Sequence, residues 1–152
     1  MAMTWDTVPI GAETGRADLV VTAAMIDEYL AAMELDLPWF TGGAPPYGAR
    51  IAPPDMVPKL CMQALFQDYL QREIGPNIRA KQAFTFYAPI PVGTSVRAVG
   101  RLVEKYERRS RRFMTFEALF TDAAGHKLVL DRRTQLVLGE NFHIEMKAGG
   151  EQ

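Results

Sequence analysis

Apolar residues recur along this chain with two different periods, and the first of them is helical. A short apolar run at 19–21 predicts a strand. Thr22 follows it and is suited to cap a helix, because its hydroxyl can accept a hydrogen bond from an unpaired backbone N–H. The helix is expected over 23–34 and is expected to be ended by Pro38. Its apolar positions are Met25, Tyr29, Ala32 and Met33.

A long glycine- and proline-rich segment from 40 to 54 separates this helix from the next regular element. Such residues fix turns rather than helices or strands. A connection of this length inside a compact domain is uncommon and often carries function. The segment is therefore predicted to be a functional loop.

A second helix is predicted over 54–72, and it is apolar on most sides. Its polar residues recur every four positions and form one narrow stripe, consisting of Lys59, Gln63, Gln67 and Gln71. A surface helix has an apolar stripe rather than an apolar circumference. This helix must therefore be covered on most of its sides. Asp55 in the first turn suits the positive end of the helix dipole, and Pro58 is tolerated there.

After residues 75–77 the apolar period changes to two, which predicts strands. One strand carries Phe84 and Phe86. The following strands have predicted faces made of Val96, Ala98, Gly100 and Leu102, then of Met114, Phe116, Ala118 and Phe120. The last strand is predicted to present Leu128, Leu130, Thr134, Leu136 and Leu138 on one face. Arg132 interrupts this face, so Arg132 is expected to lie near an edge or to have a partner.

These elements predict an α+β fold in which one long apolar helix is wrapped by a curved antiparallel sheet. Three long strands joined by short turns indicate an antiparallel meander. A sheet with one apolar face needs a cover, and the apolar helix needs a wrapper. The chain of 152 residues is expected to form a single domain over 1–146, followed by a flexible tail over 147–152.

Composition excludes some classes of function. The net charge of −1 gives no reason to expect nucleic acid or an anionic membrane as a partner. The start of the chain lacks the features of a secretory signal, and no apolar run is long enough to span a bilayer, so a cytoplasmic protein is expected. Cys61 is the single cysteine, and within an apolar helix it is expected to be a small buried hydrophobe. His126 and His143 have no metal-ligand spacing, so no metal and no cofactor are expected.

Several short motifs together resemble the MaoC-like hydratases and the related fatty-synthase-type dehydratase domains, which have the hot-dog fold. The likeness covers roughly residues 8–138. It is carried by Val20-Val21-Thr22 before a helix with Tyr29, by Ile51-Ala52-Pro53-Pro54 before the central helix, by Phe84-Thr85-Phe86-Tyr87-Ala88-Pro89 with Pro91-Val92-Gly93-Thr94, by Tyr106-Glu107-Arg108-Arg109, and by 122–125.

The resemblance implies a homodimer, or a heterodimer with a hot-dog homologue, that binds a coenzyme A or acyl-carrier-protein thioester in a tunnel at the interface. The active hydratases add water to the acyl thioester or remove it. An Asp and a His before the central helix handle the two protons. A backbone N–H at the N-terminus of that helix stabilises the charge on the thioester oxygen.

This chain departs from that pattern at two places. The stretch Asp36-Leu37-Pro38-Trp39-Phe40 matches the Asp and the Pro, but its spacing is one residue short and the His position falls on Phe40 or Thr41. Neither side chain shuttles protons at neutral pH as an imidazole does. Pro54 stands where the family has a glycine whose N–H serves the oxyanion, and proline has no N–H. The catalytic pair is therefore expected to be incomplete.

The candidate site residues follow from this comparison. Asp36 and Tyr47 are the candidate catalytic residues. The residues expected to bind substrate are Trp39, Phe40, Tyr47, Ala52, Pro54 and Asp55. Arg108 and Arg109, in a basic run with Arg111 and Arg112, are candidate contacts for coenzyme A phosphates.

Four hypotheses remain open at this stage. The chain is an acyl-thioester hydratase or dehydratase that uses Asp36, or it is a non-catalytic thioester-binding subunit that pairs with an active homologue. It is otherwise a hot-dog thioesterase that uses Asp55, or a variant biosynthetic enzyme such as an isomerase or cyclase.

Overall fold

The computed structural model describes residues 4–43 and 45–139. His143 and the tail over 147–152 lie outside the described residues. The elements follow in the order β1 (Glu13–Val20), α1 (Ala23–Met33), α2 (Pro38–Thr41), α3 (Met56–Met62), η1 (Gln63–Gln67), η2 (Leu70–Ile74), β2 (Asn77–Phe86), β3 (Ser95–Arg108), β4 (Arg111–Thr121) and β5 (Lys127–Val137). In the described part of the chain, no helix has the length and apolarity needed to cross a bilayer.

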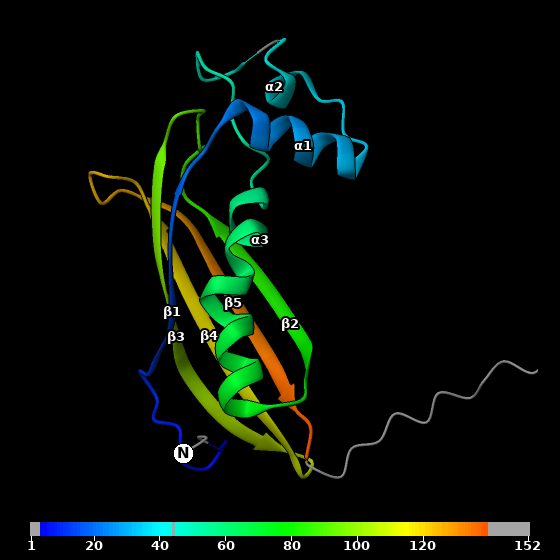
Figure 1. Ribbon diagram of the computed structural model, residues 1–152, viewed down its shortest axis with the longest axis vertical. Coiled ribbons are helices and arrows are strands. Elements are labelled where there is room, and N and C mark those ends of the chain that lie inside the picture. The colour runs from blue at the N-terminus through cyan, green and yellow to red at the C-terminus, as the bar shows by residue number, and fades with distance from the viewer. Residues whose placement is uncertain (1–3, 44, 140–152) are drawn as a thin grey trace, which may run out of the picture.

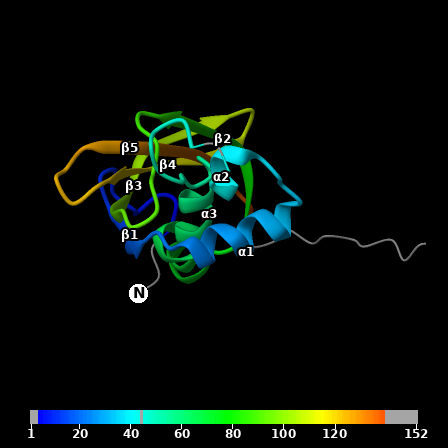
Figure 2. The same ribbon diagram turned by 90° about the horizontal axis from the view of Figure 1, so that it is seen from above.

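The five strands form one antiparallel sheet in the order β1-β3-β4-β5-β2. The segments α3, η1 and η2 run as one long helix along the concave face of this sheet (Figure 1). Seen from above, the sheet curves around that helix (Figure 2), while α1 and α2 lie beyond its N-terminal end (Figure 1). The predicted α+β architecture, a hot-dog fold, is confirmed.

The central helix is buried along most of its length, as its apolar circumference predicted. Its buried residues are Met56, Val57, Cys61, Leu65, Phe66, Tyr69 and Leu70. Leu60 and Ala64 are exposed in the single chain, Leu60 over half of its surface. The uncovered flank carries Lys59, Gln63 and Gln71 of the predicted polar stripe, with Leu60 and Ala64 as exposed apolar residues.

The helix approaches β1 and β3 so closely that only glycine fits between them. A Cβ atom on Gly15 would lie 2.0 Å from the Ala64 carbonyl oxygen, and one on Gly100 would lie 2.7 Å from the Leu65 carbonyl oxygen. The Thr14 hydroxyl donates a 2.7 Å hydrogen bond to that Leu65 oxygen. Leu65 belongs to η1, which is a π-helix, and the wide turns of a π-helix disturb the regular helical ladder. Here a strand residue supplies the donor, which fixes the helix against this side of the sheet.

The apolar faces predicted for β3 and β4 are confirmed, but the face predicted for β5 is wrong. Phe120 pairs with Val129, and Phe116 pairs with Arg133. Residues opposite each other in an antiparallel pair share a face. The face of β5 toward the helix therefore carries Val129, Asp131, Arg133 and Gln135, whereas Leu130, Thr134 and Leu136 lie on the outer face. A period of two gives alternation but not its phase, and the leucines suggested the wrong phase.

Two predictions about individual residues have different outcomes. Arg132 has the partners it was expected to need, because it forms ion pairs with Glu104 at 3.3 Å and with Glu117 on the outer face. Pro38 does not end the first helix. That helix ends at Met33, where Glu34 adopts the left-handed conformation with φ of 53°, and Pro38 instead begins α2. Proline is favoured at the first position of a helix.

Asp131 and Arg133 form an ion pair that is almost completely buried beneath the central helix. The Arg133 guanidinium lies 4.4 Å from the centre of the Phe66 ring, which contributes a cation–π contact. The second carboxylate oxygen of Asp131 accepts a 3.2 Å hydrogen bond from Gln82. A buried charge is tolerated only when it is paired in this way.

We expect a Gly15→Ala variant to be strongly destabilised, by about 3 kcal/mol, because the added methyl group meets the helix backbone rather than a flexible side chain. Thermal and urea unfolding measure the change. Gly139→Ala is the matched control, since a Cβ there has no neighbour within 4 Å. Equal stability of the two variants would contradict the close packing of helix and sheet.

We expect Arg133→Met alone to destabilise the fold by roughly 3–5 kcal/mol, because Asp131 is left charged and unpaired in the core. The double variant Asp131→Leu/Arg133→Met removes both charges and is expected to be close to the wild type in its free energy of unfolding. A double-mutant cycle measures the coupling. Additive effects of the two substitutions would show that the pair does not act as a unit.

Candidate functional site

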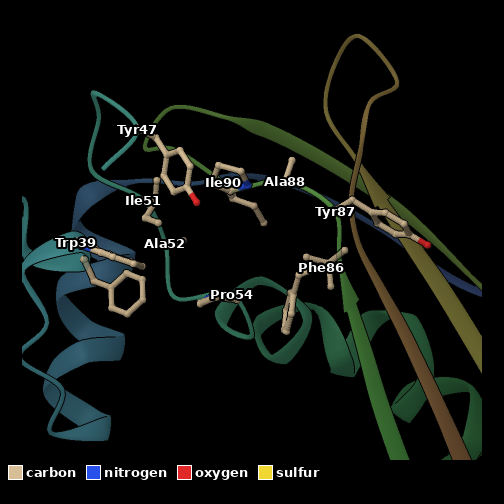
Figure 3. Close-up of a pocket in the computed structure, with 12 residues that line it drawn as sticks. Trp39, Tyr47, Ile51, Ala52, Pro54, Phe86, Tyr87, Ala88 and Ile90 are labelled. Atoms are coloured by element: carbon tan, nitrogen blue, oxygen red, sulfur yellow. The ribbon is translucent and has the colours of Figure 1, made fainter. Parts of the chain in front are cut away.

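A cavity of about 270 Å³ lies at the N-terminal end of the central helix, where the long loop meets the end of β2 (Figure 3). Its wall is almost entirely apolar or aromatic. The residues that line it are Trp39, Phe40, Tyr47, Ile51, Ala52, Pro54, Phe86, Tyr87, Ala88, Pro89, Ile90 and Val129. An apolar concavity with few polar groups is typical of a small-molecule site.

Backbone hydrogen bonds fix the loop that forms one wall of the cavity. The Ala52 N–H donates to the Ile90 carbonyl oxygen at 2.8 Å, and the Val92 N–H donates to the Arg50 carbonyl oxygen at 3.0 Å. Ile51 also forms a β-bridge with Pro91. The approach to the central helix is thereby tied to the segment after β2, so the two walls of the cavity have a defined separation.

Arg50 joins the two short helices α1 and α2 next to the cavity. Its guanidinium donates a 2.5 Å hydrogen bond to the Asp27 carboxylate on α1 and another to the Phe40 carbonyl oxygen in α2. The Arg50 side chain is only 19% exposed, whereas Asp27 is 66% exposed, so solvent reaches this ion pair from the Asp27 side. Arg50 therefore ties α2, and with it Trp39 and Phe40, to α1.

The cavity has a buried floor and an exposed aromatic rim. The floor is formed by Ile51, Ala52, Ile90 and Val129, which are all buried. Trp39, Tyr47 and Phe86 form the rim, and each has about half or more of its surface exposed. The Tyr47 hydroxyl is directed toward the middle of the cavity, whereas the Tyr87 hydroxyl points away from it (Figure 3).

The structure brings together five of the six residues that the sequence predicted to bind substrate. Trp39, Phe40, Tyr47, Ala52 and Pro54 line the cavity. Sequence reasoning missed the opposite wall, which consists of Phe86, Tyr87, Ala88, Pro89, Ile90 and Val129. The prolines that break the strand period after Phe86 were the available signal, because they mark the place where the chain leaves the sheet.

The other candidate residues lie away from this cavity. Asp36 is exposed in the connection between α1 and α2 and is not part of the cavity wall. Arg108 and Arg109 lie at the turn between β3 and β4, at the opposite end of the molecule from the cavity (Figure 1). His126 is in the exposed turn before β5, with its ring nitrogen 3.0 Å from the Asp122 carboxylate.

Asp55 precedes α3 but faces Lys59 rather than the cavity. Its carboxylate lies 2.8 Å from the Lys59 ammonium group, which also donates a 3.0 Å hydrogen bond to the Tyr29 hydroxyl. Partial burial raises the pKa of Asp55, but the hydrogen bonds and the charge of Lys59 more than offset this and hold the pKa below its ordinary value. A carboxylate held ionised in this way is a weak general base.

Within the described residues, the cavity wall contains neither a carboxylate nor an imidazole. It also offers few backbone donors, because the Ala52 N–H is bonded to Ile90 and the next two residues are prolines. Cys61 faces the core, and burial raises the pKa of its thiol to about 11, so it is protonated at neutral pH. No cluster of three or more His, Cys, Asp or Glu suited to a metal occurs among residues 4–43 and 45–139.

The fold and the cavity together define a hot-dog protein with an apolar binding site at the entrance to its central helix. The family model of the FAS1-like dehydratase domain region matches residues 9–131, and the chain belongs to this family. No curated protein matches the sequence.

Solved structures with the same fold include several hydratases and dehydratases. The monoamine oxidase regulatory protein from Archaeoglobus fulgius has 17% identity and a TM-score of 0.76, covering 90% of this chain and 97% of its own. The HadBC (3R-hydroxyacyl-ACP dehydratase) complex from Mycobacterium tuberculosis has 21% identity and a TM-score of 0.71, covering 86% of this chain and 98% of its own. The R-hydratase PhaJ1 from Pseudomonas aeruginosa has 14% identity and a TM-score of 0.68, covering 95% of this chain and 97% of its own.

We expect the Asp55–Lys59 pair to contribute to stability only above acidic pH. Because the folded pKa of Asp55 lies below its ordinary value of 3.8, the contribution is present above that value and is lost as pH falls through the folded pKa. Asp55→Asn is expected to lower Tm at pH 7 by about 2 °C, since the pair is partly exposed, and to flatten the acid limb of the stability profile. Lys59→Gln should reproduce the loss at pH 7; an unchanged profile in both variants would contradict the interaction.

Proposed function

We propose that this protein binds acyl thioesters in the apolar cavity and that the hydration or dehydration chemistry of its family depends on a second subunit. The observation that carries the proposal is the composition of the cavity wall, which is apolar and aromatic but has no acid–base pair among the described residues. Such a wall can hold an acyl chain. General acid–base catalysis needs a titratable group within hydrogen-bond reach of the substrate.

The backbone at the cavity supports binding more than catalysis. In acyl transfer and hydration, charge that develops on the thioester oxygen is stabilised by aimed N–H donors. At this entrance the Ala52 N–H is already donated to Ile90, and Pro53 and Pro54 have no N–H. The loop thus uses its donor for its own structure, and a chain built in this way gains little stabilisation of a transition state.

The exposed edge of the sheet supports a dimer. Nearly all residues of β2 are exposed, although the strand is ten residues long and carries Ile78 and Phe86, each about half exposed. The helix flank at Leu60 is exposed as well. A long edge strand with apolar residues is an aggregation hazard unless another strand covers it. A second copy, or a hot-dog homologue, is the partner that fits, and the related HadBC structure is itself a complex.

A second candidate function is slow hydration by this chain alone. It is favoured by Tyr47, whose hydroxyl is directed into the cavity and is the most obvious proton donor there. The thioesterase hypothesis is supported less well, since Asp55 is paired with Lys59 and does not line the cavity.

Binding and turnover of crotonyl-coenzyme A test the proposal. We expect the purified protein to bind this thioester by calorimetry and to leave its enoyl absorbance unchanged until a homologue with a complete Asp/His pair is added. Trp39→Ala is expected to weaken binding about tenfold, because an exposed rim aromatic is lost. Leu35→Ala is the matched control, as Leu35 is an exposed apolar residue nearby that does not line the cavity.

The alternatives give different results in the same assay. Turnover by the protein alone that is abolished in Tyr47→Phe would establish the second candidate. Turnover that persists in Tyr47→Phe and disappears in Asp36→Asn would assign the chemistry to the carboxylate instead. Absence of binding to crotonyl-coenzyme A, to longer acyl thioesters and to acylated carrier protein would refute the proposal.

A further inference from the structure

The cap that α1 and α2 form presents a surface that is both apolar and acidic. Every residue from 31 to 39 is exposed, and Met33 and Leu37 each expose about half of their surface. A soluble protein rarely gathers large exposed apolar side chains in one short segment unless a partner covers them. We call the acidic cap surface the set Glu28, Met33, Glu34, Asp36 and Leu37, all of which are exposed.

The charge of the cap has one sign. Residues 22–43 contain four acidic residues and no lysine or arginine. One of the four, Asp27, is bonded to Arg50. The three carboxylates of the acidic cap surface form no ion pair or hydrogen bond with residues 4–43 and 45–139. A partner that fits this surface must therefore bring cations, because an acidic or anionic surface would be repelled.

The turn between β3 and β4 has the opposite character. We call Arg108, Arg109 and Arg111 the arginine turn, and their guanidinium groups form no ion pair or hydrogen bond with other described residues. Together with Phe113 they line a hollow of about 410 Å³. The Phe113 ring stacks on Tyr106 with centroids 4.9 Å apart. Arginine and aromatic residues are enriched where proteins meet, so this turn offers the groups that the cap requires.

The backbone of the turn indicates that its charge has a use of its own. Arg109 and Ser110 both have positive φ, of 51° and 58°. Asparagine and glycine adopt this conformation more readily and are the usual residues of such a two-residue hairpin turn. An arginine is thus retained at a position where its backbone is unfavourable, and such outliers commonly accompany function.

The two surfaces lie at opposite ends of the molecule, so one chain cannot join them (Figure 1). Two copies that lie side by side and antiparallel bring each cap next to the turn of the other copy. The same contact then forms twice, and the assembly closes as a two-fold dimer. The exposed strand β2 runs between the two ends and is available for the same partner.

We infer that the acidic cap surface of one copy docks on the arginine turn of a second copy. Glu34 and Asp36 pair with the guanidinium groups, and an apolar side chain of the cap enters the hollow beside Phe113. The occupant is a second copy because this chain carries both halves of the contact, three unpaired carboxylates at one end and three unpaired arginines at the other. The inference goes beyond the proposed function and does not depend on thioester binding.

Reversal of charge at either surface tests the contact. The variant Glu34→Arg/Asp36→Arg has a positive cap, and Arg108→Glu/Arg109→Glu has a negative turn. In the homodimer of either variant like charges face each other. The dissociation constant of the dimer, measured by analytical ultracentrifugation, is therefore expected to rise about tenfold or more in each.

The matched control reverses charge elsewhere on the same strand. Arg97→Glu/Arg101→Glu changes two exposed arginines of β3 that lie away from the turn and is expected to dimerise as the wild type does. The wild-type dissociation constant is expected to rise with salt, because ions screen exposed charges. Should a reversal variant fail to fold, Glu34→Gln/Asp36→Asn replaces it and is expected to remove most of this salt dependence.

A mixture of the two reversal variants gives the sharpest result. In the mixed dimer the positive cap faces the negative turn, and the unchanged cap faces the unchanged turn, so both contacts are attractive. We expect the mixture to dimerise within about threefold of the wild-type dissociation constant, although neither variant does so alone. Recovery requires two folded chains, which excludes unfolding as the reason for the loss in each single variant.

The contrary outcomes are equally distinct. A wild-type protein that stays monomeric, reversal variants that dimerise as well as the control, or a mixture that shows no recovery would each overturn the inference. An oligomer that keeps growing with concentration would overturn the closed two-fold arrangement. Binding of crotonyl-coenzyme A is measured separately, so failure of this contact and failure of the proposed function are told apart.

Discussion

The close contact between the central helix and the first two neighbouring strands of the sheet, β1 and β3, determines most of this structure. Gly15 and Gly100 remove the side chains that would separate them, and Thr14 bonds the Leu65 carbonyl oxygen inside a π turn. The backbone of the helix comes closest to β1 and β3, whereas its Phe66 and Tyr69 rings reach Phe116 on β4, and Phe66 also contacts Arg133 on β5. Because the helix sits toward one side, its other flank and the strand β2 are left exposed. The asymmetry that packs the core thus creates the surface on which a second subunit is proposed to lie.

The polar face of β5 shows that this interior is not optimised for stability alone. Asp131, Arg133 and Gln135 are buried where hydrophobic residues would pack without a desolvation cost. The Asp131–Arg133 pair and the contact with Phe66 offset part of that cost. Several of their polar atoms, including the Gln135 amide, have no protein partner among the described residues. Ordered water is the simplest way to satisfy such groups.

Much of the fold could be predicted from the sequence because its strongest patterns are local. The apolar circumference of the central helix, the Thr22 cap and the alternation in β3 and β4 each reflect a backbone geometry with a fixed period. The phase of β5 could not be obtained in this way, since its leucines face outward and its charged residues face inward. Only the register with β4 determines which face is buried, and register is a property of the folded sheet.

The candidate site was predictable from one side only. The binding residues were chosen from the family resemblance and from their place in or next to the glycine- and proline-rich loop, and five of the six line the cavity. The opposite wall comes from the end of β2 and from β5, more than thirty residues away in sequence, and it is joined to the loop by the Ala52–Ile90 hydrogen bond. Asp36 was selected by spacing to a family motif, and spacing does not say which way a connection between two helices turns.

The loop at the cavity has two uses that compete for the same backbone groups. A catalytic entrance needs free N–H donors directed at the thioester oxygen, whereas a rigid wall needs those donors bonded to the protein. In this chain the second use prevails: Ala52 bonds Ile90, and two prolines follow it. The same prolines reduce the conformational freedom of the loop in the unfolded chain, which favours a preformed cavity. A wall of this kind fits a subunit that presents or shapes an acyl group, and the acid–base groups and the oxyanion donors are then required only in the subunit that faces it.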